Sequence, residues 1–128
     1  NPYFLTQYTG YQNLKLLASI KNKIGDEDIV HALERVGLEA ADKRKVRKYS
    51  LGMKQRLGIA AAIMEEPDIL LLDEPFNAID EGGLQLIRDI LADFKKAGRI
   101  VILACHDKEE LESVSDEIIK MKNGKIEV

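Results

Sequence analysis

The sequence predicts an α/β fold in which a helical first half precedes part of a parallel sheet. Apolar residues recur at helical spacing in the segments before residue 67. Two short, continuously apolar runs, 69–72 and 100–104, then alternate with helical patterns, as is typical of strands buried on both faces of a parallel sheet. Asn123-Gly124 between two strand-like runs predicts a C-terminal β-hairpin. This order of elements favours an open α/β sheet.

The composition limits the classes of function. The chain has 128 residues, 45% of them hydrophobic and 32% charged, so it can bury a core under a soluble surface. Its net charge of -3 gives no global basic field, and we expect no nucleic-acid partner. The single cysteine, Cys105, excludes an internal disulfide and fits a reducing compartment. No apolar run reaches the roughly 20 residues that a membrane-spanning helix needs.

The first predicted helix follows an irregular lead-in. Pro2 and Gly10 are breakers, so residues 1–10 are expected to lack regular structure. From Tyr11 to Ile20, leucine and alanine recur at helical spacing, which predicts a short amphipathic helix.

A second and a third helix are expected next. Asp26 is predicted to cap the second helix, and Gly37 stands where a glycine that ends a helix belongs. His31 would lie on the surface of that helix. Ser50 is predicted to cap the third helix, which spans about residues 51–65.

The second half is expected to alternate strands and helices. The predicted elements are a strand at 69–72, a helix at 82–97 stopped by Gly98, a strand at 100–104, a helix at 108–114, and hairpin strands at 118–121 and 125–128.

Asp73 and Glu74 stand at the end of the first predicted strand. Ligands of open parallel sheets bind at the carboxyl ends of the strands, so both carboxylates are well placed for metal and water chemistry. In this interpretation Asp73 would hold Mg²⁺ and Glu74 would point toward an attacking water. The alternative is a strand that ends in two solvated acids.

Two further positions are candidates for anion chemistry. Ser50 and Gly52 begin a helix, where a hydroxyl and free backbone N–H groups form a natural anion site, although an ordinary N-cap is the simpler alternative. His106 directly follows the second strand and should reach the same sheet edge as Asp73 and Glu74. A lone histidine is commonly structural, but this position favours function.

Taken together, these motifs resemble the ABC ATPase family over nearly the whole chain. Residues 49–56, Tyr-Ser-Leu-Gly-Met-Lys-Gln-Arg, are similar to the family's signature sequence. Asp73-Glu74 resembles the end of the Walker B strand with its catalytic glutamate, residues 77–80 resemble the D-loop, and His106 resembles the switch histidine. The resemblance implies a helical signature subdomain at 1–52 and the C-terminal part of a P-loop NTPase core at 53–128.

The sequence departs from the family pattern in two ways. Leu51 and Met53 replace a glycine and a glutamine of the usual signature, while Ser50 and Gly52 are retained; such variants resemble ATPases of peptide-antibiotic and drug exporters. The phosphate-binding loop G-x-x-x-x-G-K-[ST] does not occur in the 128 residues. We therefore expect a C-terminal portion of the domain that is inactive alone.

The resemblance also implies a mechanism. Two complete domains would pair head to tail around two ATP molecules, with Ser50 and Gly52 holding the γ-phosphate in trans and Asp80 at the dimer seam. Asp73 would position Mg²⁺, Glu74 would act as general base, and His106 would contact the γ-phosphate. Hydrolysis would drive a transmembrane permease subunit. The protein would therefore lie in the cytoplasm, at the cytoplasmic face of the cell membrane.

Other interpretations stay open at this point. The parent protein could be a soluble ABC ATPase that acts on ribosomes or DNA, or the chain could be a non-catalytic interaction module; the compact helical half, with no heptad coiled coil, favours a transporter. Pro2 to Leu5 would dock on the permease or serve the core. The basic run 43–48 would be a solvated loop or would attract phosphates or anionic lipid headgroups.

Overall fold

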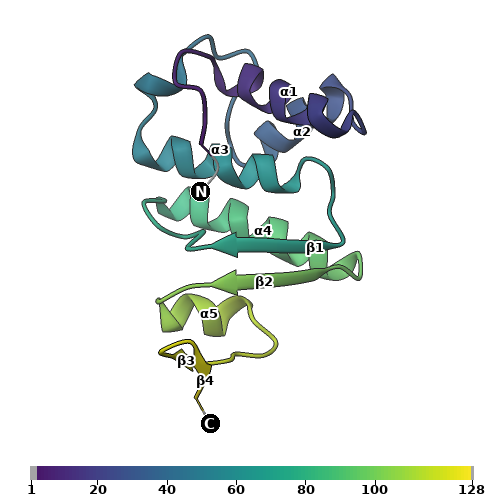
Figure 1. Ribbon diagram of the computed structural model, residues 1–128. Coiled ribbons are helices and arrows are strands. Elements are labelled where there is room, and N and C mark those ends of the chain that lie inside the picture. The colour runs from purple at the N-terminus through teal and green to yellow at the C-terminus, as the bar shows by residue number, and fades with distance from the viewer. Residues whose placement is uncertain (1–2, 128) are drawn as a thin grey trace.

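A computed structural model describes residues 3–127; Asn1, Pro2 and Val128 lie outside the described residues. Figure 1 shows a helical layer at the N-terminal end, then a pair of strands backed by a helix, then a small C-terminal hairpin. The elements in chain order are α1 (Gly10–Lys21), α2 (Asp26–Arg35), the 3₁₀ turn η1 (Val46–Lys48), α3 (Leu51–Ile63), β1 (Ile69–Asp73), α4 (Glu81–Lys96), β2 (Ile100–Ala104), α5 (Lys108–Val114), β3 (Met121–Lys122) and β4 (Lys125–Ile126). Within residues 3–127, no helix combines the length and the apolar character that crossing a membrane requires.

The expected helices form, and local chemistry explains where they begin and end. The Ser50 side chain accepts the Met53 N–H at 3.1 Å, so Ser50 caps α3 as predicted. Gly37 has φ +77, and the Leu38 N–H bonds the Leu33 carbonyl at 2.9 Å, which is the glycine-terminated ending expected for α2. His31 is exposed on α2, as predicted.

Two predicted helix starts are wrong by one residue. Gly10 is the first residue of α1 rather than a breaker, because Thr9 and Gln12 form a capping box in front of it. Gly25, not Asp26, is the N-cap of α2, and the Asp28 carboxylate accepts the Gly25 N–H at 3.0 Å. In both cases a side chain three residues into the segment fixes the start.

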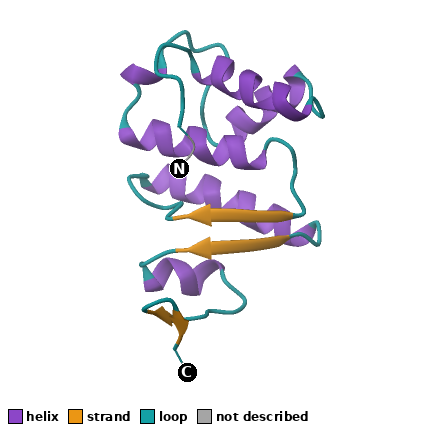
Figure 2. Cartoon of the chain, in the orientation of Figure 1, coloured by secondary structure: helices purple, strands orange, loops and turns teal. Residues whose placement is uncertain are grey.

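β1 and β2 form a parallel pair with the register Leu71↔Ile102, as the βαβ pattern predicted. The expectation that β1 is buried on both faces is wrong for these residues. Leu70 and Leu72 face the core, whereas Ile69 and Leu71 are exposed, because the helices cover only one face of the sheet. Figure 2 shows α4 next to these two strands, and α1, α2 and α3 further from them on the same side as α4.

The C-terminal part is small and exposed. α5 spans the predicted residues, and Asn123 and Gly124 have φ 52 and 77, so the predicted turn of the hairpin is confirmed. Its strands are shorter than expected: residues 118–120 are not in a strand. The Arg88 guanidinium ties α4 to α5 through two hydrogen bonds to the Glu110 carboxylate at 2.8 and 3.0 Å.

One hydrophobic core runs through both halves of the chain. Five elements each contribute a side chain that is at most 1% exposed: Leu14 from α1, Leu33 from α2, Leu57 from α3, Leu70 from β1 and Phe94 from α4. α3 lies between the helical layer and the sheet, so it fixes the position of one relative to the other (Figure 1).

Candidate functional site

The two acidic residues at the end of β1 face different surroundings. Asp73 is the last residue of β1, and it is exposed on the uncovered face of the sheet with Ile69 and Leu71. Glu74 comes after the strand, and 26% of its side chain is exposed. The structure therefore separates the carboxylates, which leaves each free for a different task.

The backbone of Glu74 adopts an unusual conformation. Its φ is +48, the left-handed region that costs a non-glycine residue about 1–2 kcal/mol. Two strong hydrogen bonds fix it there: the Glu74 N–H donates to the Ala104 carbonyl at 2.7 Å, and the Gln55 Nε2 donates to the Glu74 carbonyl at 2.7 Å. This turn redirects the Glu74 side chain away from the face that Asp73 occupies.

Glu74 meets His106 across the ends of β1 and β2. The His106 Nε2 lies 3.4 Å from a Glu74 carboxylate oxygen, and the His106 side chain is otherwise fully exposed. Both residues line an open hollow of about 480 Å³ together with Phe76, Asn77, Cys105 and Asp107. A half-buried carboxylate beside an imidazole can accept a proton from water and stabilise charge on a nearby group.

Ser50 and Gly52 begin α3 on the same side of the molecule as the strand ends (Figure 1). Ser50 is exposed, and its hydroxyl oxygen accepts the capping bond, so its O–H remains available as a donor. A Cβ on Gly52 would lie 2.7 Å from the Ala78 carbonyl oxygen, so only glycine permits this approach. Gly52 therefore packs against residues 77–80, the segment that resembles the D-loop.

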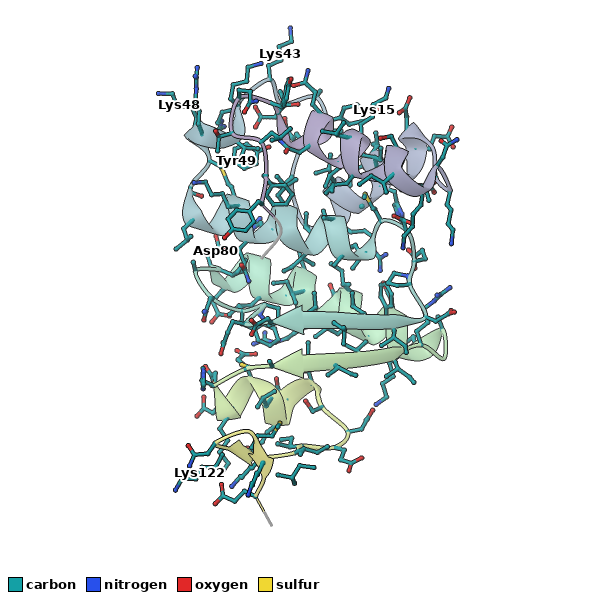
Figure 3. All side chains as sticks on the ribbon, in the orientation of Figure 1. Lys15, Lys43, Lys48, Tyr49, Asp80 and Lys122 are labelled. Carbon is teal, nitrogen blue, oxygen red and sulfur yellow. The ribbon has the colours of Figure 1, made fainter. Side chains whose placement is uncertain are left out.

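Asp80 caps α4 and also forms an ion pair. One of its carboxylate oxygens accepts the Gly83 N–H at 2.8 Å and the Arg56 Nη2 at 2.9 Å. Figure 3 shows Asp80 between α3 and α4. The Arg56 guanidinium lies between two glycines. A Cβ on Gly37 would lie 2.9 Å from the Arg56 Nη1, and a Cβ on Gly83 would lie 2.6 Å from the Arg56 Nη2. Arg56 thus joins α3 to the end of α2 and the start of α4.

The remaining polar groups give little sign of a metal site made by this chain alone. Within residues 3–127, no group of three histidine, cysteine or acidic residues is placed to hold a metal. Mg²⁺ in phosphoryl transfer needs no such group, because it is bound by one or two carboxylates together with substrate phosphates and water. Asp73 can be such a ligand.

Cys105 also lines the hollow beside His106. Burial raises the pKa of the Cys105 thiol, which disfavours its reactive thiolate.

The basic run 43–48 is held in place by backbone bonds. The Val46 N–H donates to the Tyr8 carbonyl at 2.9 Å and the Arg47 N–H to the Thr6 carbonyl at 3.1 Å. Val46 is buried, whereas Lys43 and Lys48 point outward (Figure 3).

The N-terminal lead-in, predicted to dock on the permease or to serve the core, divides between exposed and packed residues. Tyr3 and Leu5 are exposed, and Phe4 packs against the core. Pro2 lies outside the described residues.

The structure brings some predicted site residues together and not others. Glu74 meets His106, and Gly52 meets the D-loop-like segment. Among residues 3–127, no hydrogen bond or ion pair joins Ser50 to Asp73, Glu74 or His106. No individual role was predicted for Gln55 or Arg56. The run Lys54-Gln55-Arg56, which is the only polar stretch in a helix otherwise made of apolar residues and glycine, was a usable signal.

The fold and the site define a class of protein. Helices over a parallel sheet, with acidic and histidine side chains at the strand ends, give the α/β architecture of the P-loop NTPase fold. Comparison with family models specifies it further: the model described as "ABC transporter" matches residues 2–77. The chain belongs to the ABC transporter family.

Curated relatives cover nearly all of the chain. The uncharacterized ABC transporter ATP-binding protein YybJ of Bacillus subtilis is 50% identical over 99% of the chain, which spans 58% of that protein. The bacitracin transport ATP-binding protein BcrA of Enterococcus faecalis is 42% identical over 96% of the chain, which spans 40% of that protein. The chain thus spans about half the length of the relatives it matches.

A solved structure shows the same fold. The dimeric ATP-binding cassette MJ0796 in a post-hydrolysis state, bound to ADP and Pi, superposes with a TM-score of 0.82 at 24% identity. The match covers 98% of this chain and 57% of the solved chain. The structural likeness therefore confirms the predicted ATPase-cassette fold.

Proposed function

We propose that this chain works as part of an ABC-type ATPase that couples ATP hydrolysis to export across a membrane. The observation that carries the proposal is the Glu74–His106 pair, 3.4 Å apart at the carboxyl ends of two parallel strands. Ligands of open α/β sheets bind at that edge, and the family of the chain supplies the reaction class.

Glu74 acts as the general base in this proposal. Its left-handed backbone and the bonds to Ala104 and Gln55 hold the carboxylate beside His106 rather than beside Asp73. There it accepts the proton of the attacking water, or orients that water for in-line attack. His106, whose side chain is exposed, contacts the γ-phosphate and stabilises the charge that develops on it.

Ser50 and Gly52 serve the ATP bound by a second, partner domain. The Ser50 hydroxyl and the N–H groups at the start of α3 lie at the positive end of the helix, which favours phosphate. Asp80 lies at the seam between the two domains. Its capping and ion-pair bonds involve one carboxylate oxygen, so they hold Asp80 in place and leave the other oxygen for the partner.

Asp73 is the residue proposed to hold Mg²⁺. Bound Mg²⁺ would neutralise charge on the phosphates. Asp73 supplies one carboxylate at the strand end, and its exposure on the uncovered sheet face lets phosphate and water reach it. The two adjacent acidic residues, which face different ways, would thus have different roles.

The partners follow from the relatives. A bacitracin transport protein and a lantibiotic transport protein are among them, so we propose a permease that exports a peptide antibiotic or a similar compound, with this chain peripheral at the cytoplasmic face of the membrane. Residues 1–52 would form the signature subdomain that contacts the permease, and residues 53–128 would belong to the catalytic core. The phosphate-binding loop is absent from the 128 residues, so the chain alone would be inactive.

The test measures ATP hydrolysis by the full-length protein that contains these residues, numbered as here. Glu74→Gln should lower kcat by at least about 100-fold, the usual contribution of a general base. Glu27→Gln, the same change at an exposed position on α2, is the matched control and should keep full activity. Equal activity of wild type and Glu74→Gln would refute the proposed role of the site.

A further inference from the structure

Gln55 reaches from α3 to the backbone of Glu74. Its Nε2 donates to the Glu74 carbonyl at 2.7 Å, and the bond joins residues 19 positions apart across the boundary between the helical layer and the sheet. From this geometry we infer that Gln55 is the positioning residue of the Glu74 carboxylate. The inference rests on the proposed function, because it assigns Gln55 a part in the reaction that Glu74 performs.

The bond matters because the conformation of Glu74 is costly. A non-glycine residue keeps φ +48 only where its surroundings enforce it. Within residues 3–127, the one other donor to the Glu74 carbonyl is the Asn77 N–H at 3.3 Å, which is beyond the usual range for such a bond. Without the amide of Gln55 the Glu74 N–H keeps its bond to Ala104, but the Glu74 carbonyl loses its short hydrogen bond. The backbone of Glu74 is then held at one end only, and the carboxylate is held less firmly beside His106.

The position of Gln55 gives the bond a second consequence. Gln55 lies in the first turns of α3, five residues after its N-cap Ser50 and three residues after Gly52. A rigid helix start therefore connects the residues proposed to bind the partner's ATP with the general base of this chain. A shift of α3 on phosphate binding would be passed to the backbone of Glu74 by this hydrogen bond, alongside the contacts of Gly52 and Arg56 with residues 78–80.

The experiment uses the full-length protein with two substitutions at one position. Gln55→Met keeps the length and volume of the side chain and removes the donor, whereas Gln55→Lys keeps a donor of similar reach. Gln85→Met is the matched control, since Gln85 lies exposed on α4 and bonds only Asp89 in its own helix. The kcat of wild type gives the full rate, and the kcat of Glu74→Gln gives the rate without the general base.

Two quantities are measured for each variant. The first is the kcat and KM for ATP; Gln55→Met should lower kcat about tenfold with KM within about twofold, and Gln55→Lys should recover most of the loss. The second is the rate of amide hydrogen exchange at residues 73, 74 and 76–78, which should rise in Gln55→Met and stay at the wild-type value in Gln85→Met and Gln55→Lys.

The outcomes separate the inference from the function on which it rests. If wild type shows no turnover that depends on Glu74, the proposed function fails and the role of Gln55 in hydrolysis fails with it. If turnover depends on Glu74 but Gln55→Met retains wild-type kcat and exchange, only the inference is overturned. A loss of kcat that Gln55→Lys shares in full would indicate a packing role and would also overturn it.

Discussion

The ion pair between Arg56 and Asp80 should be measurable as a coupling energy in the folding of this chain. The Arg56 side chain is 20% exposed and the Asp80 side chain 77% exposed, with 2.9 Å between nitrogen and oxygen. Hydrogen bonds to charged groups contribute about 1.5–3 kcal/mol, but exposed ion pairs contribute about 0.2–1 kcal/mol. Because water reaches Asp80, we expect a coupling of about 1 kcal/mol, at the lower end of the combined range.

A double-mutant cycle isolates that coupling from the other role of Asp80. Arg56→Met removes the pair and keeps the buried stem, so it should cost about 1 kcal/mol. Asp80→Ala removes the pair and also the N-cap bond to Gly83, so it should cost about 2 kcal/mol. The double variant loses one pair and one cap, which also gives about 2 kcal/mol rather than the additive 3 kcal/mol.

Equilibrium urea unfolding supplies the free energies for the cycle. The coupling should shrink at high salt, since Asp80 is exposed to screening. Asp80→Asn is the control: its amide oxygen can still cap α4 while the charge is lost, so it should cost less than Asp80→Ala. Additive costs, to within about 0.3 kcal/mol, would show that the ion pair of Arg56 with Asp80 contributes nothing to folding, and would refute the reasoning.

Two further predictions concern stability at high pH and the isolated chain. Burial is the main cause that raises the pKa of Tyr49 above its usual value of 10.0, with the Asp42 charge adding to it. Stability contributed by the neutral phenol is therefore present below pH 10 and is lost as the pH rises through the folded-state pKa. The free energy of unfolding measured against pH should fall in this range, by less in Tyr49→Phe than in wild type, and by the wild-type amount in the exposed Tyr8→Phe. The purified 128-residue chain should release no phosphate from Mg²⁺-ATP; steady turnover that Glu74→Gln abolishes would contradict this.

Most of the fold could be predicted because its signals are local. The range of α5, the cap at Ser50 and the ending at Gly37 depend on side chains within a few residues of the feature. The strand pair followed from two apolar runs separated by a helical pattern. Errors at Gly10 and Gly25 came from capping side chains that favour one start over its neighbour by a small free energy.

The arrangement of the site was harder to predict because it depends on long-range contacts. Glu74 and His106 were expected at one sheet edge, and the His106 Nε2 lies 3.4 Å from a Glu74 carboxylate oxygen. Nothing local indicates that Glu74 turns into the left-handed region, since its backbone bonds go to Gln55 and Ala104, 19 and 30 residues away. Arg56 likewise meets Asp80 across 24 residues, and periodicity carries no such information.

The uncovered face of the β1–β2 pair is apolar. Ile69, Leu71, Ile100 and Ile102 are each more than half exposed on one face, and soluble proteins seldom leave such a continuous apolar surface uncovered. Their side chains suit a strand pair buried on both faces, so we propose that a second layer from the same cassette covers them, in keeping with a chain that spans 58% of a relative.

Asp73 lies at the end of that same uncovered face. A layer that packs on Leu71 and Ile102 would therefore also approach the carboxylate proposed to hold Mg²⁺. In P-loop enzymes the glycine-rich loop that cradles the phosphates connects a strand to a helix, and such a unit both buries apolar side chains and presents backbone N–H groups. One packing event would then bury the exposed isoleucines and bring a phosphate-binding loop to Asp73, which links the stability of the domain to the assembly of its active site.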